Sequence, residues 1–182
     1  MSIVISGNPG VGKHTITKEI SKMLRLPIID INNIAKDAGL LEKNENTNDV
    51  DTKKLKKILE ERISEKNIIV GHLAPYVLAK NRVKTIIVLR RNPYDLIEVY
   101  KERKYSDKKI IENIGSEVLG IIAHDSISKF HEKTFQINNS GKDIQGTVKK
   151  IMTIISDNKG NEIVDWLDLV TKNNDLKKFF VD

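Results

Sequence analysis

One short segment, GNPGVGKHT at residues 7–15, constrains the fold more than any other part of the chain. It follows a continuous apolar run, Ile3–Ile5, and precedes apolar residues whose helical spacing predicts a helix over residues 13–25. Glycines let backbone N–H groups converge on a phosphate without side-chain clashes, and a helix N-terminus favours the same anion. The alternative is an ordinary Gly-Pro-Gly turn. The order of strand, turn and helix instead predicts a nucleotide site with Lys13 as its cation.

The loop departs from the usual pattern G-x-x-x-x-G-K-[ST] because His14 stands where a hydroxyl is expected. Adenylate-kinase-type loops follow G-x-P-G-x-G-K-x-T, and Pro9 and Thr15 match that version. Thr15 is therefore expected to contact Mg²⁺, directly or through water. The His14 side chain either contacts the nucleotide or points to solvent, while its N–H donates to phosphate. The loop residues expected to bind ATP are Gly10, Val11, Gly12, Lys13, His14 and Thr15.

The rest of the chain alternates between strand and helix patterns. Further strands are predicted at residues 27–31, 67–71, 85–89 and 134–137. Helices are expected to begin at Asp51, at Asn92–Pro93, at Ser106–Asp107 (a long one reaching Ile121) and at Asp143. This alternation predicts an α/β fold with a mainly parallel five-stranded sheet and helices on both faces. Residues 40–50 are too polar for a core and are expected to form a loop or flap.

Length and composition exclude several classes of protein. The 182 residues suit one domain, predicted over residues 1–155, followed by a linker and a tail (156–182) docked through Trp166, Leu167 and Leu169. The absence of cysteine excludes disulfides, thiol catalysis and Cys-ligated zinc, and is compatible with the cytoplasm. No apolar run is long enough to span a membrane, and because the phosphate loop starts at residue 7 no signal segment is expected. The net charge of +6 indicates either a solvated lysine-rich surface or a basic face for phosphorylated ligands or RNA.

Several segments together resemble one family, the small adenylate-kinase-like NTPases known as adenylate kinase isoenzyme 6 or coilin-interacting nuclear ATPase. The matching segments are GNPGVGKHT, IIDINNIAKDAGL (28–40), VDTKKL (50–55), IIVGHL (68–73), VLRRN (88–92) and ERKYSDKKIIENIGSE (102–117). The resemblance implies a P-loop kinase fold with a small monophosphate flap (about 30–52) and a short lid (about 102–113). It also implies ATP and AMP as substrates, Mg²⁺, accompanying ATP hydrolysis, and a role in small ribosomal subunit maturation through a platform ribosomal protein and pre-ribosomal RNA.

Candidate residues outside the loop are mainly cations near the carboxyl edge of the sheet, where open α/β sheets bind ligands. Arg90 directly follows the fourth predicted strand and resembles the family's monophosphate- or transferred-phosphate-binding arginine, with Arg91 a weaker neighbour. Arg103 lies in the lid match and is expected to close over the triphosphate. A surface salt bridge is the alternative for both Arg90 and Arg103. The flap residues expected on the acceptor side are Asp30, Asn33, Lys36 and Asp51, although Asp30 equally fits a turn or cap.

The third predicted strand departs from the family pattern. Members often carry Asp-x-His there, whereas this chain has Gly71 and His72, so the carboxylate that organises the water around Mg²⁺ is missing. His72 is a candidate water or phosphate contact, and Gly71 is expected to permit close approach of the nucleotide. Asn113 and Glu117 either brace the lid or form the polar face of a helix.

Two catalytic functions remain open from the sequence. One is a nucleoside monophosphate kinase, and the other is an assembly ATPase whose closure around nucleotide regulates a ribosomal partner. The lid between Arg103 and Ser106 is so short that it excludes water poorly, which makes ATP hydrolysis beside kinase activity plausible. A third function, a binding module without catalysis, is disfavoured because Arg90 and Arg103 are both present.

Overall fold

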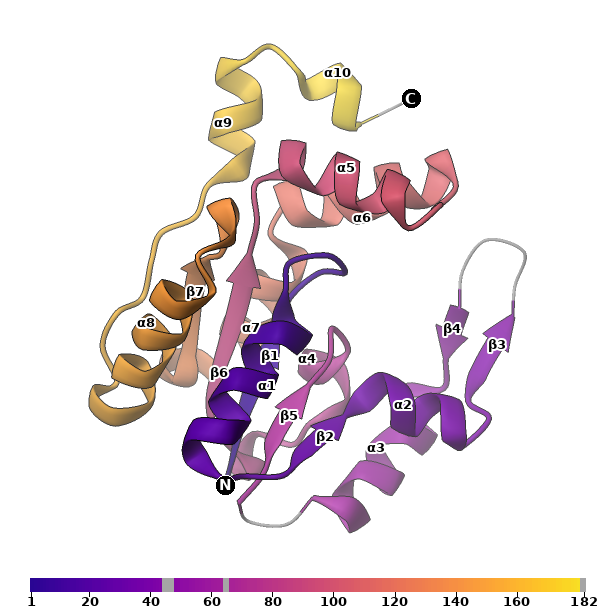
Figure 1. Cartoon of the computed structure of the whole chain (residues 1–182). Coiled ribbons are helices and arrows are strands. Elements are labelled where there is room, and N and C mark those ends of the chain that lie inside the picture. The colour runs from indigo at the N-terminus through magenta and orange to yellow at the C-terminus, as the bar shows by residue number, and fades with distance from the viewer. Residues whose placement is uncertain (44–47, 64–65, 181–182) are drawn as a thin grey trace.

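A computed structural model describes residues 1–43, 48–63 and 66–180 of the chain. Its centre is a five-stranded parallel sheet with the strand order β2-β5-β1-β6-β7, which confirms the predicted fold (Figure 1). The strands are β1 (Ser2–Ser6), β2 (Ile28–Asp30), β5 (Ile68–Val70), β6 (Val83–Arg90) and β7 (Thr134–Asn138). β1, which leads into the phosphate loop, lies at the centre, so the loop leaves the sheet where neighbouring strands also end.

The sheet is buried on both faces, as its continuous apolar strands predict. In β1, Ile3 and Ile5 face one core and Val4 faces the other. The first core lies under α1 (Lys13–Leu24) and α8 (Ile144–Asp157), and the second lies under α2 (Ile31–Asp37), α3 (Thr52–Arg62), α4 (Ala74–Val77) and α7 (Ile121–Phe130). Helices α5 (Pro93–Glu102) and α6 (Asp107–Val118) lie beyond the carboxyl ends of the strands (Figure 1).

The predicted helix starts are confirmed by their caps. The Asp51 carboxylate accepts hydrogen bonds from the N–H groups of Lys53 and Lys54, at 3.1 and 3.0 Å. The Asn92 side chain accepts from the N–H of Tyr94, with Pro93 as the first helical residue. Asp143 and Ser106 cap α8 and α6 in the same way. Side-chain acceptors satisfy N–H groups that a helix leaves unpaired at its start, which is why these short segments fix the boundaries.

One predicted boundary was wrong, and one segment has more regular structure than its composition predicts. The long helix expected from Ser106 to Ile121 is broken at Gly120, whose left-handed backbone (φ 66°) separates α6 from α7. The segment 40–50, expected as a loop or flap, contains an antiparallel hairpin in which β3 (Leu41–Lys43) pairs with β4 (Asn48–Val50). The middle of that expected flap, residues 44–47, lies outside the described residues. Polar composition missed the hairpin because paired backbones do not require apolar side chains on both faces.

The C-terminal extension packs on the body of the protein through α9 (Trp166–Lys172) and α10 (Leu176–Phe179). Within the predicted linker, the N–H of Glu162 donates to the carbonyl of Gln136 at 3.0 Å, so this segment covers the outer edge of β7. Trp166 is buried as expected, whereas Leu167 is 42% exposed and Leu169 is half-buried. Among the described residues, no helix combines the length and apolar character needed to cross a bilayer.

Candidate active site

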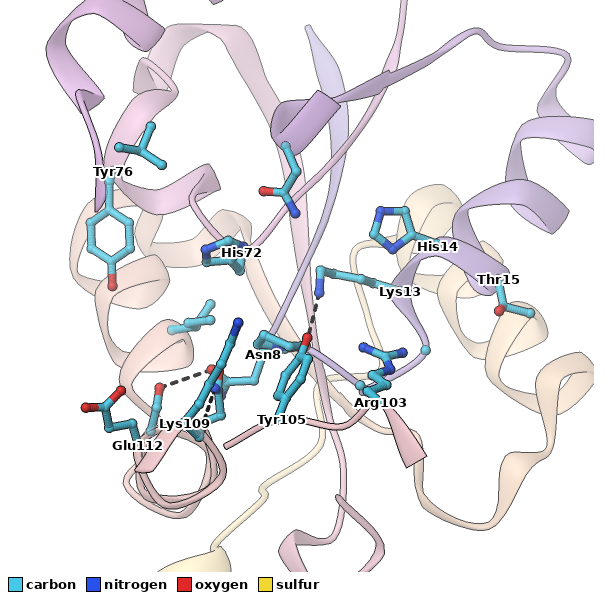
Figure 2. A pocket seen from close by; sticks show the side chains of 18 residues that line it. Asn8, Lys13, His14, Thr15, His72, Tyr76, Arg103, Tyr105, Lys109 and Glu112 are labelled. Carbon is cyan, nitrogen blue, oxygen red and sulfur yellow. Dashed lines mark hydrogen bonds between the residues drawn. The ribbon is translucent and has the colours of Figure 1, made fainter. Parts of the chain in front are cut away.

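A cavity of about 650 Å³ opens at the carboxyl end of the sheet (Figure 2). Its wall combines the phosphate loop, the turn after β5, the lid, one face of α6 and two residues from the flap region, Asn32 and Val50. Lys13, His72 and Arg103 come from three different segments and surround the same space. The predicted phosphate site is therefore one part of a larger cavity that continues toward the flap.

The carbonyl groups of the phosphate loop are taken up by donors within the protein. Each carbonyl from Asn8 to Val11 accepts a hydrogen bond from a side chain, and the four donors are Lys13, Tyr100, Arg91 and Asn139 respectively. In the described part of the chain, no group accepts from the N–H groups of residues 11–14. Unpaired N–H groups at a helix N-terminus form an anion-binding nest, so the loop has the conformation that phosphate requires.

Gly12 is the point where the loop enters helix α1. It caps the helix with a left-handed backbone (φ 92°), and a Cβ at this position would lie 2.7 Å from Nδ2 of Asn139. Because Asn139 Nδ2 donates to the Val11 carbonyl at 2.7 Å, a side chain at position 12 would disturb one of the bonds that hold the loop. A glycine here serves both the backbone conformation and the close approach of Asn139.

Lys13 is a buried cation in the wall of the cavity. Its side chain is 5% exposed, and Nζ donates to the Asn8 carbonyl at 3.0 Å. Burial and then the neighbouring positive charge of Arg103 lower the pKa of Lys13 to about 8, against the opposing effect of Asp30 and Glu117. Lys13 is therefore still mostly protonated at neutral pH, and a phosphate would supply the counter-charge that it lacks.

His14 bonds to the flap region, which neither open alternative anticipated. Its Nε2 lies 2.9 Å from Oδ2 of Asp30, while Oδ1 of Asp30 accepts from the N–H groups of Asn32 and Asn33. Although partial burial alone would raise the pKa of Asp30, the hydrogen bond from His14 and those from Asn33 and Asn32 lower it. Of the two alternatives for Asp30, the structure shows the cap, with His14 as an additional partner.

The predicted acceptor-side residues are only partly brought together. Asp30 and Asn33 lie outside the main cavity, and Lys36 is exposed and does not line it. Asn32, the residue beside the predicted Asn33, lines the cavity instead. Asp51 caps α3 and is not part of the wall.

Arg90 is not at the cavity, and this placement corrects the expectation that it reaches a phosphate. It is 3% exposed, and its Nε donates to Oε1 of Glu117 at 2.8 Å. Its two terminal nitrogens donate to Gln136 Oε1 and to the Glu117 carbonyl, at 2.8 and 2.6 Å. All donating nitrogens of the guanidinium thus have acceptors inside the protein. Arg91, the expected weaker neighbour, instead supports the Gly10 carbonyl of the loop.

Arg103 does line the cavity, at the junction between α5 and α6. Next to it, the Tyr105 ring stacks on Tyr100 with centroids 5.4 Å apart and an interplanar angle of 11°. Lys109 Nζ lies 4.3 Å from the centroid of the Tyr105 ring. Tyr100 also donates its hydroxyl to the Pro9 carbonyl, so the lid and the phosphate loop are fixed to each other.

One face of α6 supplies Asn113, which the sequence singled out, and three cavity residues that the sequence reasoning missed, Lys109, Glu112 and Ser116. Lys109, Glu112, Asn113 and Ser116 line the cavity at spacings of three and four, which is one face of a helix. Helical spacing counted from Asn113 would have found them. Glu117 points elsewhere: it is fully buried, so the polar-face alternative is wrong for this residue.

The turn after β5 places His72 at the cavity and Gly71 behind it. Burial and then the charge of Lys13 lower the pKa of His72 to about 4, so its imidazole is neutral at pH 7. A Cβ on Gly71 would lie 2.8 Å from Cβ of Ile31. The glycine therefore makes room for Ile31, which corrects the expectation that it admits the nucleotide. Within residues 1–43, 48–63 and 66–180, no cluster of three His, Cys, Asp or Glu residues is arranged to hold a metal.

Comparisons with known proteins agree with this architecture. A family model described as "AAA domain" matches residues 3–120. A protein of Methanocaldococcus jannaschii named "Putative adenylate kinase" is 35% identical over 173 residues, 92% of this chain and 94% of that protein. One of Thermococcus onnurineus with the same name is 30% identical over 169 residues, 91% of each chain. This chain belongs to the family of these archaeal proteins and carries its AAA domain.

Solved structures similar to this chain identify the fold. Shikimate kinase from Bacteroides thetaiotaomicron superposes with a TM-score of 0.60 at 17% identity, covering 85% of this chain and 98% of that one. Shikimate kinase from Aquifex aeolicus gives a TM-score of 0.57 at 19% identity, covering 87% and 98%. At such identities the likeness concerns the fold alone, and it is the fold of P-loop kinases.

Proposed function

We propose that this protein is a nucleoside monophosphate kinase that converts ATP and AMP into two ADP molecules. The observation that carries the proposal is the continuity of one cavity from the phosphate loop to Val50 and Tyr76. Phosphoryl transfer needs two phosphates brought together and their charge neutralised, and little covalent help from the protein. A nucleotide kinase is also what the family membership supports.

The donor half of the site has three kinds of group for the triphosphate. The free N–H groups of residues 11–14 bind the β- and γ-phosphates, Lys13 follows the transferred charge, and Arg103 approaches from the lid. Thr15 lines the cavity with its side chain exposed. It fits as a ligand of Mg²⁺, directly or through water, because Mg²⁺ in such sites is held mainly by phosphates and waters. Mg²⁺ when bound supplies further charge neutralisation.

The acceptor half is assigned differently from the sequence-based prediction. Asn32 and Tyr76 contact the acceptor nucleotide, and Lys36, one turn after Asn32 on α2, is the cation that closure of the flap brings in. His72 offers a neutral imidazole to phosphate or to water. Arg90 and Asp30 act by holding other parts of the site, Arg90 through Glu117 and Asp30 through His14.

A second activity, ATP hydrolysis, is proposed beside the first because the lid is so short. Only residues 103–106 separate α5 from α6, which leaves little chain to exclude water from the transferred phosphate. Following the narrower resemblance to coilin-interacting ATPases, we connect this hydrolysis with small ribosomal subunit maturation in the cytoplasm, through a platform ribosomal protein and pre-ribosomal RNA. The net charge of +6 suits such a partner.

The two activities are separated by measuring ADP and free phosphate independently. Purified protein is mixed with ATP and Mg²⁺, with and without each nucleoside monophosphate. ADP that depends on AMP and forms without free phosphate supports the kinase. Phosphate release without AMP, increased by a ribosomal partner, supports the assembly ATPase. Neither product, or turnover that survives Lys13→Ala, would contradict both.

A further inference from the structure

The C-terminal extension reaches the phosphate loop through one buried carboxylate. Glu117 is 0% exposed, and its two oxygens accept four hydrogen bonds from separate parts of the chain. The donors to Oε1 are Arg90 Nε (2.8 Å), the Arg91 N–H (3.0 Å) and Trp166 Nε1 (3.0 Å), and the donor to Oε2 is Asn8 Nδ2 (2.7 Å). The end of β6, the phosphate loop and the extension therefore meet at a single charged group.

From Glu117 the connection continues to the cation of the site. Asn8 is 4% exposed, and its side chain is held at both ends, by Glu117 and by the Ser116 hydroxyl at 3.1 Å. Its carbonyl in turn accepts the hydrogen bond from Lys13 Nζ. The orientation of Asn8, and with it the position of Lys13, thus depends on where the Glu117 carboxylate lies.

Trp166 is well suited to fix that carboxylate. It is the first residue of α9 and is 8% exposed, and its indole N–H has one partner, Glu117. The extension is anchored beside it by Asp175, which accepts from the Tyr94 hydroxyl at 2.7 Å, and by Phe180, which packs over Gly115 of α6. A buried carboxylate is costly unless donors satisfy it, so each donor helps to define one position for it.

We propose that Trp166 is a positioning residue of the nucleotide site, acting through Glu117 and Asn8 on Lys13. The extension is then part of the phosphate-binding machinery, although it contacts no nucleotide. This inference rests on the proposed function only in so far as the loop binds ATP, and it does not depend on which acceptor is phosphorylated.

The first test uses the chain as it is, because Trp166 is its single tryptophan. Addition of ATP should change the indole emission, since phosphate that draws Lys13 away from Asn8 alters the partners of Glu117. In Asn8→Ala at saturating ATP this change should disappear. An emission spectrum that does not respond to ATP in the unsubstituted protein, or the same response in Asn8→Ala, would overturn the inference.

The second test is a double-mutant cycle on the dissociation constant for ATP, measured by calorimetry. Trp166→Phe keeps an aromatic side chain but removes the N–H, and should weaken ATP binding by about 3- to 10-fold. In an Asn8→Ala background the same substitution should change the constant by less than about 2-fold, since the connection is already broken. Equal effects in the two backgrounds would mean that Trp166 acts only through general stability.

Tyr94→Phe is the matched control. It removes the two hydrogen bonds that the Tyr94 hydroxyl makes with the extension, one to Asp175 and one from Asn173, but none to Glu117. Tyr94→Phe should lower the melting temperature but leave the dissociation constant for ATP within about 2-fold of the value for the unsubstituted protein. If it weakens ATP binding as much as Trp166→Phe does, the inference is contradicted. If the unsubstituted protein does not bind ATP, the proposed function is contradicted as well. If it binds ATP but the effects of Trp166→Phe and Asn8→Ala are additive, only this inference is contradicted.

Discussion

Protonation of Lys13 should control how the affinity for ATP depends on pH. Its pKa lies near 8 in the free protein, below the ordinary value of 10.5, because burial and Arg103 disfavour the charged form. A bound triphosphate places negative charge beside the ammonium group and raises the pKa again. Below pH 8 the free protein already carries the charge, so affinity is constant. Above pH 8 a proton must be taken up on binding, so affinity falls as pH rises.

The size of this effect follows from the pKa of the free protein. With a value of about 8, roughly one molecule in thirty retains the Lys13 charge at pH 9.5. If the complex keeps Lys13 protonated, the dissociation constant for ATP should rise by about 30-fold between pH 7 and pH 9.5, equivalent to about 2 kcal/mol. The dissociation constant should still be rising at pH 9.5.

Calorimetric titrations with ATP in EDTA, at several pH values from 7 to 9.5, measure this dependence without a contribution from the metal. Lys13→Arg is the control, because a guanidinium stays charged throughout this range. Its affinity is expected to be lower overall but independent of pH, and circular dichroism at each pH confirms that both proteins remain folded. A constant affinity for the unsubstituted protein, or an equal fall in Lys13→Arg, would refute the argument.

Four further substitutions test individual residues. Thr15→Ala should lower kcat by about tenfold or more in a coupled ADP assay. His14→Ala should lower kcat much less, since only the backbone N–H of His14 is expected to bind phosphate. A larger loss in His14→Ala than in Thr15→Ala would contradict the assignment of the hydroxyl to Thr15. His72 binds its proton more weakly in the folded than in the unfolded state. About 3 kcal/mol of the unfolding free energy should therefore be lost as pH falls from 6.5 to 4. Urea unfolding of His72→Gln over the same pH range should show a clearly smaller loss. Gly71→Asp should destabilise the protein by roughly 1–3 kcal/mol in urea unfolding, because its Cβ would press on Ile31, and an unchanged midpoint would show that this contact relaxes freely.

The sheet and the loop could be predicted because their signals are local. Apolar runs mark strands buried on both faces, and Asp51 and Asn92 cap helices whose N–H groups lie only two or three residues away. The break at Gly120 carries no comparable signal, since isolated glycines also occur inside helices. Its reason is tertiary: a Cβ there would lie 3.1 Å from the Arg90 guanidinium.

The candidate site was predicted less well where a side chain's partner lies far away in the sequence. The position of Arg90 at the end of a strand is typical of a ligand-binding arginine, but Glu117 in α6 takes up its guanidinium. Similarly, choosing Asn32 over Asn33 required the phase of α2, which the Asp30 cap sets. A sequence pattern identifies the residues at the edge of the sheet, but not which of them the protein uses to satisfy its own buried charges.

The departure of His14 from the usual loop pattern follows from how the loop is held. Its carbonyl groups are bound by Tyr100, Arg91 and Asn139, which all lie far beyond the loop in the sequence. These donors, together with Lys13, fix the backbone, so the N–H groups face the cavity whatever side chain follows Lys13. The side chain of His14 is then available for a different contact, and its hydrogen bond to Asp30 joins helix α1 to the start of α2. Position 14 can thus lose the usual hydroxyl without loss of the phosphate site, provided that Thr15 supplies one.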